Sequence, residues 1–173
     1  MVEIERKWVL KRDYTVVDVI RALNIEDRQY YGYGDQVYLY TSDPQVRVRK
    51  LVGLRDGSEV YKMTIKNGSG LSRLEVESDI TKEEYEAVVN VVGVKPIHKM
   101  VWYYLDRAAN KTLELMEVND GLFVYLEVEF ENEDEACKYK LPEEIRDFFE
   151  ECTSTLSMTD VWEKLKVEGR TCK

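Results

Sequence analysis

Charged side chains alternate with apolar side chains along several short stretches of the chain, and this period of two is the feature that most constrains the fold. In the first stretch, Glu3, Glu5 and Lys7 fall on one face of an extended strand and apolar residues fall on the other. The same division recurs later, where one face carries Arg47 and Arg49, Lys62 and Lys66, Arg73, Glu75 and Glu77, or Glu127 and Glu129. The sequence therefore predicts β-strands that each present one charged face.

The predicted strands are separated by turn and helix signals. The strand period covers 2–10, 36–40, 46–52, 59–66, 71–80, 99–105, 112–118 and 122–130. The turn Asn67-Gly68-Ser69-Gly70 is typical of a hairpin, which makes the strands on its two sides antiparallel. Spacing and capping signals predict helices over 15–23, from Thr81 to near Gly93, after Pro142 through Ile145, Phe148 and Phe149, and over 158–167. The acidic stretch 131–135 is typical of a solvated loop or a helix start.

The composition indicates a globular protein and argues against two kinds of partner. The length of 173 residues fits one domain over 1–173, and 44% hydrophobic with 34% charged residues can build a core. The formal net charge of -9 argues against a nucleic-acid duplex or an anionic membrane as the main partner. A local basic site inside the fold is still compatible with this charge.

Targeting signals and soft-metal ligands are both scarce. No apolar run reaches the roughly 20 residues that span a bilayer, and the first residues are charged where a signal peptide is apolar. We therefore expect a cytoplasmic protein. Three cysteines without CxxC spacing and a single histidine argue against a zinc site, a disulfide framework and a histidine-activated nucleophile.

The charged faces have two readings. They are either the solvated outer faces of a sandwich, the usual case for one strand alone, or the lining of a lumen. Like charges two residues apart repel each other, and the chain has such pairs of both signs, for example Arg47 with Arg49 and Glu127 with Glu129. Ligands of opposite sign would relieve both kinds of pair. Guanidinium and ammonium groups suit phosphate oxygens, and carboxylates suit Mg²⁺ or Mn²⁺, so a metal polyphosphate matches both needs.

At the N-terminus the charged pattern reads Glu3-Ile4-Glu5-Arg6-Lys7, an ExExK motif, and further motifs follow in order along most of the chain. These are Gln36-Val37-Tyr38-Leu39, Arg47-Val48-Arg49, Thr64-Ile65-Lys66, Arg73-Leu74-Glu75-Val76-Glu77 and Glu127-Val128-Glu129. The set resembles the CYTH superfamily, also called triphosphate tunnel metalloenzymes. The resemblance implies an α+β fold in which an eight-stranded antiparallel β-barrel forms a triphosphate tunnel with helices packed outside, and it implies Mg²⁺ or Mn²⁺ as cofactor.

The resemblance also implies roles for residues at the matching positions. The catalytic group would be Lys7, Lys62 and Arg73, and the phosphate-binding group would be Arg47, Arg49, Lys66 and Lys99. The metal ligands would be Glu3, Glu5, Glu127 and Glu129, with Glu75, Glu77 and Glu114 as supporting tunnel acids. Tyr38 and Tyr40 are either tunnel residues or ordinary strand residues.

Two positions depart from the family pattern. Lys99 is kept, but Val101 stands where the family often has an arginine; Glu114 is kept, but Met116 stands where it has an aspartate. Glu117 falls on the opposite strand face unless a bulge intervenes. These departures bear on catalysis more than on ligand binding.

The expected function is metal-dependent hydrolysis of a triphosphate, either inorganic tripolyphosphate or a nucleoside or thiamine triphosphate. Phosphoryl transfer needs charge neutralisation and positioning more than a protein nucleophile. Two alternatives stay open: a class IV-type adenylate cyclase that converts ATP to cyclic AMP, and a non-catalytic polyphosphate- or nucleotide-binding module. The expected partner is a small triphosphate ligand, and a homodimer is left open.

Overall fold

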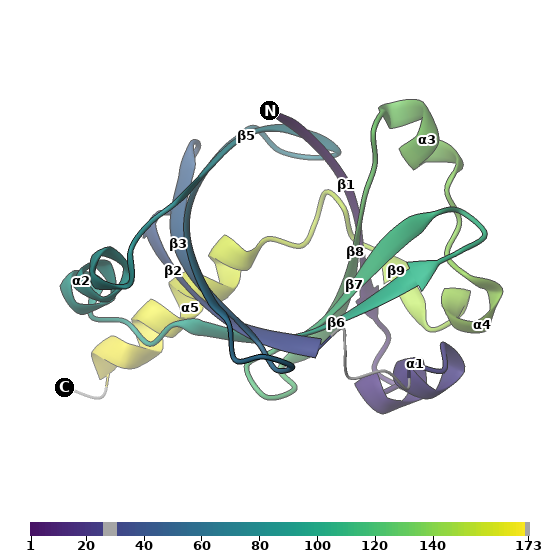
Figure 1. Cartoon of the computed structure of the whole chain (residues 1–173), viewed down its shortest axis with the longest axis horizontal. Coiled ribbons are helices and arrows are strands. Elements are labelled where there is room, and N and C mark those ends of the chain that lie inside the picture. The colour runs from purple at the N-terminus through teal and green to yellow at the C-terminus, as the bar shows by residue number, and fades with distance from the viewer. Residues whose placement is uncertain (26–30, 172–173) are drawn as a thin grey trace.

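Eight antiparallel strands close into a barrel in a computed structural model that describes residues 1–25 and 31–171 (Figure 1). The strands run in the order β5-β4-β3-β2-β6-β7-β8-β1, and β1 pairs again with β5. Their bounds are β1 Val2–Leu10, β2 Tyr31–Tyr40, β3 Gln45–Gly53, β4 Glu59–Asn67, β5 Ser72–Asp79, β6 Ile97–Asp106, β7 Lys111–Val118 and β8 Phe123–Glu129. The predicted eight-stranded antiparallel barrel is confirmed.

The first strand closes the barrel. β1 pairs with β5 at Val2↔Leu74, Glu3↔Arg73 and Ile4↔Ser72, and its next residues pair with β8. A ninth strand, β9 (Phe149–Glu151), pairs with the end of β1. Closure leaves each of the eight barrel strands with a neighbour on both sides, and it directs every second side chain into the lumen.

Helices cover the barrel on two sides and across one end. Their bounds are α1 Val16–Ala22, α2 Lys82–Val92, α3 Glu133–Lys138, α4 Glu143–Arg146 and α5 Met158–Thr171. In Figure 1, α2 lies on one side, α1, α3 and α4 lie on the other, and α5 crosses behind the barrel opening. The capping box of Thr81 with Glu84 begins α2, and Gly93 at φ 62° ends it, as the sequence predicted. None of the described helices has the length and apolarity needed to cross a membrane.

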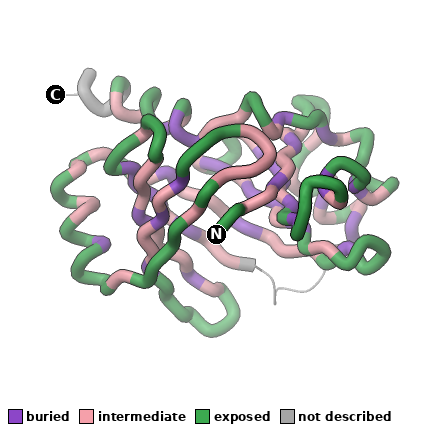
Figure 2. Tube along the Cα trace, turned by 90° about the horizontal axis from the view of Figure 1, so that it is seen from above, coloured by how far each residue is buried: buried purple, intermediate pink, exposed green. Residues whose placement is uncertain are grey.

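The apolar core lies mainly between the barrel and its helices (Figure 2). On one side, Leu115, Leu126 and Val128 of the barrel pack against residues of α3 and α4, including fully buried Ile145. At the end covered by α5, Trp162 is also fully buried and contacts the ring of Tyr38 at 6.0 Å between centroids. Each such buried side chain stabilises the fold by about 1.5–3 kcal/mol, so the barrel wall and its helices form one packed unit.

Two sequence predictions differ from the structure in extent, and a third that left two alternatives open is decided by it. β2 begins at Tyr31, before the predicted range 36–40. The predicted helix after Pro142 ends at Arg146, because Phe149 joins β9 opposite Leu10 and is buried there. The acidic stretch is a helix start, with the Asn132 side chain accepting a hydrogen bond from the Glu135 backbone. At Phe149, strand pairing with Leu10 outweighs the helical spacing of the apolar residues.

Candidate active site

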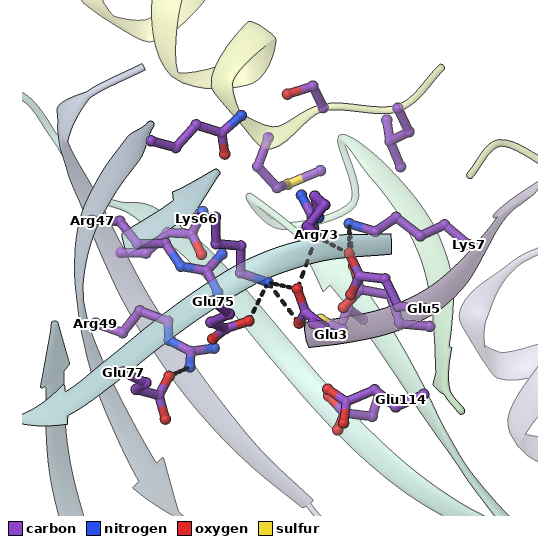
Figure 3. Close-up of a pocket in the computed structure, with 18 of the residues that line it drawn as sticks. Glu3, Glu5, Lys7, Arg47, Arg49, Lys66, Arg73, Glu75, Glu77 and Glu114 are labelled. Atoms are coloured by element: carbon purple, nitrogen blue, oxygen red, sulfur yellow. Dashed lines mark hydrogen bonds and ion pairs between the residues drawn. The ribbon is translucent and has the colours of Figure 1, made fainter. Parts of the chain in front are cut away.

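The charged strand faces point into a cavity of about 970 Å³ inside the barrel (Figure 3). Every predicted site residue lies on an inward strand face. Those that line the cavity are Glu3, Glu5, Lys7, Arg47, Arg49, Lys66, Arg73, Glu75, Glu77, Lys99, Glu114, Glu127 and Glu129. Lys62 shares the inward face of β4 with Lys66 but is not among the cavity-lining residues. The lumen reading of the charged faces therefore holds, and the sandwich reading is wrong.

A network of ion pairs joins β1, β5 and β4 at the closing seam. Lys66 Nζ lies 2.6 Å from a Glu3 carboxylate oxygen and 3.0 Å from one of Glu75. Arg73 forms ion pairs with Glu5 and with Glu3, the latter at 3.3 Å. These side chains are largely shielded from solvent, so each carboxylate there needs a cation to be stable in its charged form. The network stabilises the seam that closes the barrel.

Lys7 extends this network onto β8. Its Nζ lies 3.0 Å from Glu5 and 2.8 Å from Glu127. Burial opposes the ionisation of Glu127, but the charges of Lys7 and Lys99 outweigh it and lower the Glu127 pKa to about 2. Glu127 is therefore a carboxylate over the whole physiological pH range.

A second group of ion pairs lies where β3, β4 and β5 run side by side. Lys62 Nζ lies 2.8 Å from Glu77 and 3.5 Å from Asp79, and Arg49 also pairs with Glu77. Burial opposes the ionisation of Glu77, but the hydrogen bond from Lys62 and the charge of Arg49 lower its pKa to about 2. This acid holds Lys62, predicted to be catalytic, and Arg49, predicted to bind phosphate; its supporting role stays a prediction.

Two acids on β7 and β8 lack such partners. Glu114 lies directly across from Glu127, and neither Glu114 nor Glu129 forms an ion pair with any described residue. Burial, together with the charges of Glu127 and Glu129, raises the Glu114 pKa to about 7. Burial and the charge of Glu3 raise the pKa of Glu129 as well. The charges of Arg49 and Lys99 only partly offset these effects at Glu114, and the charge of Lys66 only partly offsets them at Glu129.

Two cations facing the same cavity are also unmatched. Arg47 forms no ion pair with a described residue; Tyr38 is its hydrogen-bonding neighbour, and its buried Nε has no hydrogen-bond partner. Lys99 donates a 2.6 Å hydrogen bond to the Tyr125 hydroxyl and lies 5.3 Å from that ring's centre. Burial, with the nearby charge of Arg47, holds the pKa of Lys99 well below its usual range. An anion in the cavity would stabilise the charged form of both side chains.

The carboxylates fit a hard cation by chemistry but are not gathered around one point. Within residues 1–25 and 31–171, no three His, Cys, Asp or Glu side chains are arranged to hold a metal ion. Glu3 and Glu5 form ion pairs with lysine and arginine, whereas Glu114 and Glu129, on the strands that carry Glu127, form none with a described residue. Carboxylate oxygens are the ligands that Mg²⁺ and Mn²⁺ prefer. The binding of Mg²⁺ or Mn²⁺ by these acids stays a prediction, and we add Glu114 to the candidate ligands.

The positions that depart from the family pattern also face the lumen. Val101 and Met116 line the cavity. The register of β7 against β8 is continuous, so Glu117 lies opposite Val124 and on the other face. The bulge that would turn Glu117 inward is therefore absent from this pairing. A bulge does occur in β2 after Tyr38, which leaves Tyr38 in the lumen and Tyr40 exposed.

The barrel has two different ends. At the end we call the covered mouth, α5 and the segment 153–157 before it lie across the lumen and line the cavity. At the other end, the open mouth, a smaller cavity of about 220 Å³ is lined by Asn110, Lys111 and Thr112 together with Glu114, Glu127 and Glu129. Figure 3 shows α5 at one end of the site and Glu114 at the other.

Sequence reasoning missed Tyr125, the fully buried hydrogen-bond partner of Lys99, and one segment of the cavity lining. Tyr125 precedes Glu127 and Glu129 at the same spacing of two, so strand alternation was a signal for its inward direction. The segment 153–157 has no periodicity, and no sequence signal indicated that it returns to the barrel. Cys137 and Cys152 are free thiols, and Cys172 lies outside the described residues.

Comparison with known proteins finds likeness in structure rather than in sequence. No protein-family model matches the chain, and a search of curated sequences finds no relative. The inorganic triphosphatase NE1496 superposes with a TM-score of 0.53 at 23% identity, covering 88% of this chain and 90% of that one. The PH1819 protein from Pyrococcus horikoshii gives 0.63 at 19%, covering 94% and 99%.

Two further solved structures are similar to this chain in fold. A candidate adenylate cyclase from Bacillus halodurans gives a TM-score of 0.57 at 16% identity, covering 78% of this chain and 83% of that one. A chain of the Schizosaccharomyces pombe Mediator head module gives 0.50 at 11%, covering 80% and 89%. At these identities the likeness establishes the fold, and the activity has to be argued from the site.

Proposed function

This chain folds as a CYTH-type barrel, and we propose that it is a metal-dependent hydrolase of triphosphates. One observation carries the proposal: unmatched charges of both signs face the same cavity. Arg47, Lys99, Glu114 and Glu129 form no ion pair with any residue in the described part of the chain. A metal-bound polyphosphate supplies the missing anion and the missing cation together.

The basic side chains would hold the phosphate chain. Arg47 and Arg49 stand two residues apart on β3, where guanidinium groups can bind phosphate oxygens through paired hydrogen bonds. Lys7, Lys66 and Arg73 already hold carboxylates, so their positions are fixed before a ligand arrives. Such prior ordering lowers the entropy cost of positioning the reacting groups.

The acids would hold the cation. Glu114, Glu127 and Glu129 on two paired strands are the candidates, because all three face the lumen and carboxylate oxygens suit these cations, although no three described acids surround one point. A bound Mg²⁺ or Mn²⁺ would polarise the terminal phosphoryl group and neutralise the charge that develops on it. The chain's own residues then have to position the phosphates and hold the leaving group, which matches the absence of a protein nucleophile in this chemistry.

Phosphate release from inorganic tripolyphosphate tests the proposal. We expect turnover with Mg²⁺ or Mn²⁺, loss of turnover in EDTA, and recovery when either metal is added back. Arg55, exposed in the turn after β3, offers a matched control, because Arg55→Ala should leave both activity and metal dependence unchanged. Full activity in a metal-stripped sample would reject the mechanism.

Adenylate cyclisation is the second candidate, favoured by the structural likeness to the Bacillus halodurans protein. In that reaction the ribose hydroxyl of ATP attacks the α-phosphorus and pyrophosphate leaves. Products separate the two activities: cyclic AMP with pyrophosphate indicates the cyclase, and ADP with orthophosphate indicates the hydrolase. Tight binding without either product would indicate a binding module, which the inward Val101 and Met116 would then explain.

A further inference from the structure

The cations that face the lumen are held in two different ways. Most of them are held by carboxylates, as Lys66 is by Glu3 and Glu75. Lys99 is instead held by a neutral group, because its Nζ donates a 2.6 Å hydrogen bond to the Tyr125 hydroxyl and forms no ion pair with a described residue. A carboxylate offsets the charge of the cation that it holds, whereas a phenol hydroxyl leaves that charge in place.

The part of the lumen wall that lies under the Lys99 side chain is uncharged. Val101, Met116 and Tyr125 lie directly across from one another on β6, β7 and β8, and they form a buried row. On β2, the residue opposite Lys99 is Gly34, which has no side chain to offer as a partner. The ammonium group therefore ends over the Tyr125 ring, 5.3 Å from its centre.

Tyr125 is a fixed partner that lies behind the cavity lining. Its side chain is fully buried, and its ring packs against that of Phe123 with 5.8 Å between centroids. Lys99 is among the cavity-lining residues, whereas Tyr125 is not. Because lysine has a flexible four-carbon stem, a fixed hydroxyl limits where its ammonium group can lie. Tyr125 would therefore act on a ligand in the lumen through Lys99 rather than by contact.

An acid that could compete for this lysine lies nearby. Glu127 is at the next inward position of β8 after Tyr125, and its charge interacts with that of Lys99. The printed ion pair of Glu127 is instead with Lys7, at 2.8 Å. Without the Tyr125 hydroxyl, the Lys99 ammonium would be free to turn toward Glu127 and form an ion pair. A phosphate oxygen would then have to displace that carboxylate before it could bind the ammonium group.

Arg47 on β3 shows a similar arrangement. It forms no ion pair with a described residue, and Tyr38 is its hydrogen-bonding neighbour. The Tyr38 side chain is buried, and its hydroxyl accepts a 3.3 Å hydrogen bond from the Gln36 amide. Lys99 and Arg47 thus each have a buried tyrosine hydroxyl beside them in place of a carboxylate.

We propose that Tyr125 is a positioning residue, whose hydroxyl holds the Lys99 ammonium away from Glu127 and so keeps its charge available to a phosphate oxygen. The hydroxyl takes one of the three ammonium donors and leaves two for the ligand. This inference rests on the proposed function and adds to it a residue that does not touch the ligand.

A double-mutant cycle tests whether Tyr125 acts through Lys99. Tyr125→Phe removes the hydroxyl and keeps the ring, and Lys99→Met removes the ammonium group and keeps an unbranched side chain. Dissociation constants of inorganic tripolyphosphate would be measured by calorimetry in EDTA, where we expect no turnover. Lys99→Met should weaken binding at least about tenfold, and Tyr125→Phe should weaken it about threefold to tenfold. In the double variant, Tyr125→Phe should add no loss to that of Lys99→Met, because the group that it positions is gone.

Tyr139→Phe is the matched control. The Tyr139 hydroxyl also donates a buried hydrogen bond, to Asp106, but neither residue lines the cavity. Its loss should leave tripolyphosphate affinity unchanged. The crystal structure of Tyr125→Phe should show the Lys99 ammonium within about 4 Å of a Glu127 carboxylate oxygen, the limit for an ion pair.

A measurement on the unmodified protein keeps the test valid if a variant does not fold. The ¹⁵N-labelled Lys99 ammonium should show restricted motion in nuclear magnetic resonance relaxation, and free motion would overturn the positioning role. An equal loss from Tyr125→Phe with and without Lys99, or no loss in the folded variant, would also overturn it, while tripolyphosphate binding upheld the site. If the unmodified protein binds no tripolyphosphate with or without Mg²⁺, the proposed function falls and the inference falls with it.

Discussion

Inward charges are paired differently on two walls of the barrel. One wall is formed by β1, β4 and β5, and the other by β6, β7 and β8. On the first wall the charges neutralise one another: Lys66 contacts Glu3 and Glu75, and Arg73 contacts Glu3 and Glu5. On the second wall, Glu114 lies across from another glutamate, and Lys99 donates a hydrogen bond to the Tyr125 hydroxyl but forms no ion pair with a described residue. Similar residues are therefore matched on one wall and unmatched on the other.

Strand register explains why the charges are paired on one wall and unpaired on the other. The pairing Lys66↔Glu75 puts opposite charges side by side, whereas the pairing Glu114↔Glu127 puts like charges side by side. A matched pair contributes to barrel closure and needs nothing else. An unmatched group costs stability until a ligand of opposite charge binds, so we propose that the unmatched groups contact the ligand.

The largest effect should come from the unmatched arginine and its neighbour. Replacing Arg47 and Arg49 with alanine should weaken tripolyphosphate binding by about 3–6 kcal/mol, since each charged hydrogen bond contributes roughly 1.5–3 kcal/mol. Calorimetric titration of the folded double variant measures this loss. Unchanged affinity would show that these arginines do not contact the ligand.

The matched wall supplies the contrast for that experiment. Arg73→Ala leaves Glu3 and Glu5 without one of their cations, so it should lower the thermal unfolding temperature of the ligand-free protein. Arg47→Ala removes no ion pair and should lower it much less. Equal destabilisation by the two variants would break the distinction between matched and unmatched charges.

A smaller effect concerns the pH dependence of metal-free stability. The Glu114 pKa is raised from 4.5 to about 7, so the unfolded chain releases this proton first, and stability is lost as pH rises between these values. Glu114→Gln should remove that loss, which amounts to about 3 kcal/mol at most. Urea unfolding in EDTA at pH 5 and pH 8 measures it. Glu77→Gln should act oppositely and destabilise at neutral pH, because a lowered pKa contributes stability that is lost only as pH falls through about 2.

The smallest effect concerns the number of metal ions. The inward position after Glu114 on β7 is Met116, whose thioether is a poor ligand for Mg²⁺ or Mn²⁺. Titration of Mn²⁺ with a bound non-hydrolysable triphosphate analogue should give one tight site per chain and a second that is at least about tenfold weaker. Glu117→Gln should leave this result unchanged because Glu117 faces away. Two comparably tight sites would contradict the prediction.

The sequence was sufficient to predict the eight barrel strands and which charged residues share a strand face, but it left open whether those faces point inward. Alternation of Glu3, Glu5 and Lys7 fixes which side chains share a face, and the motif order suggested the barrel. Partner choice was not predictable, because whether Glu114 meets a lysine or a glutamate depends on register between distant strands. Helical spacing was likewise misleading at Phe149, which pairs with Leu10 of a strand far away in sequence. The segment 153–157 could not be predicted to line the cavity, because its residues show no hydrophobic periodicity.

The closing strand β1 is made before the other strands of the barrel, and this bears on the timing of folding. β1 completes its main pairing only with β8, whose last residue is Glu129. At a synthesis rate of about 5–20 residues per second, the first strand waits roughly 6–25 seconds for that partner. An unpaired strand is a template for aggregation, and charged residues along it discourage wrong pairing. The residues that line the lumen in the finished barrel therefore protect the nascent chain while the barrel is still open.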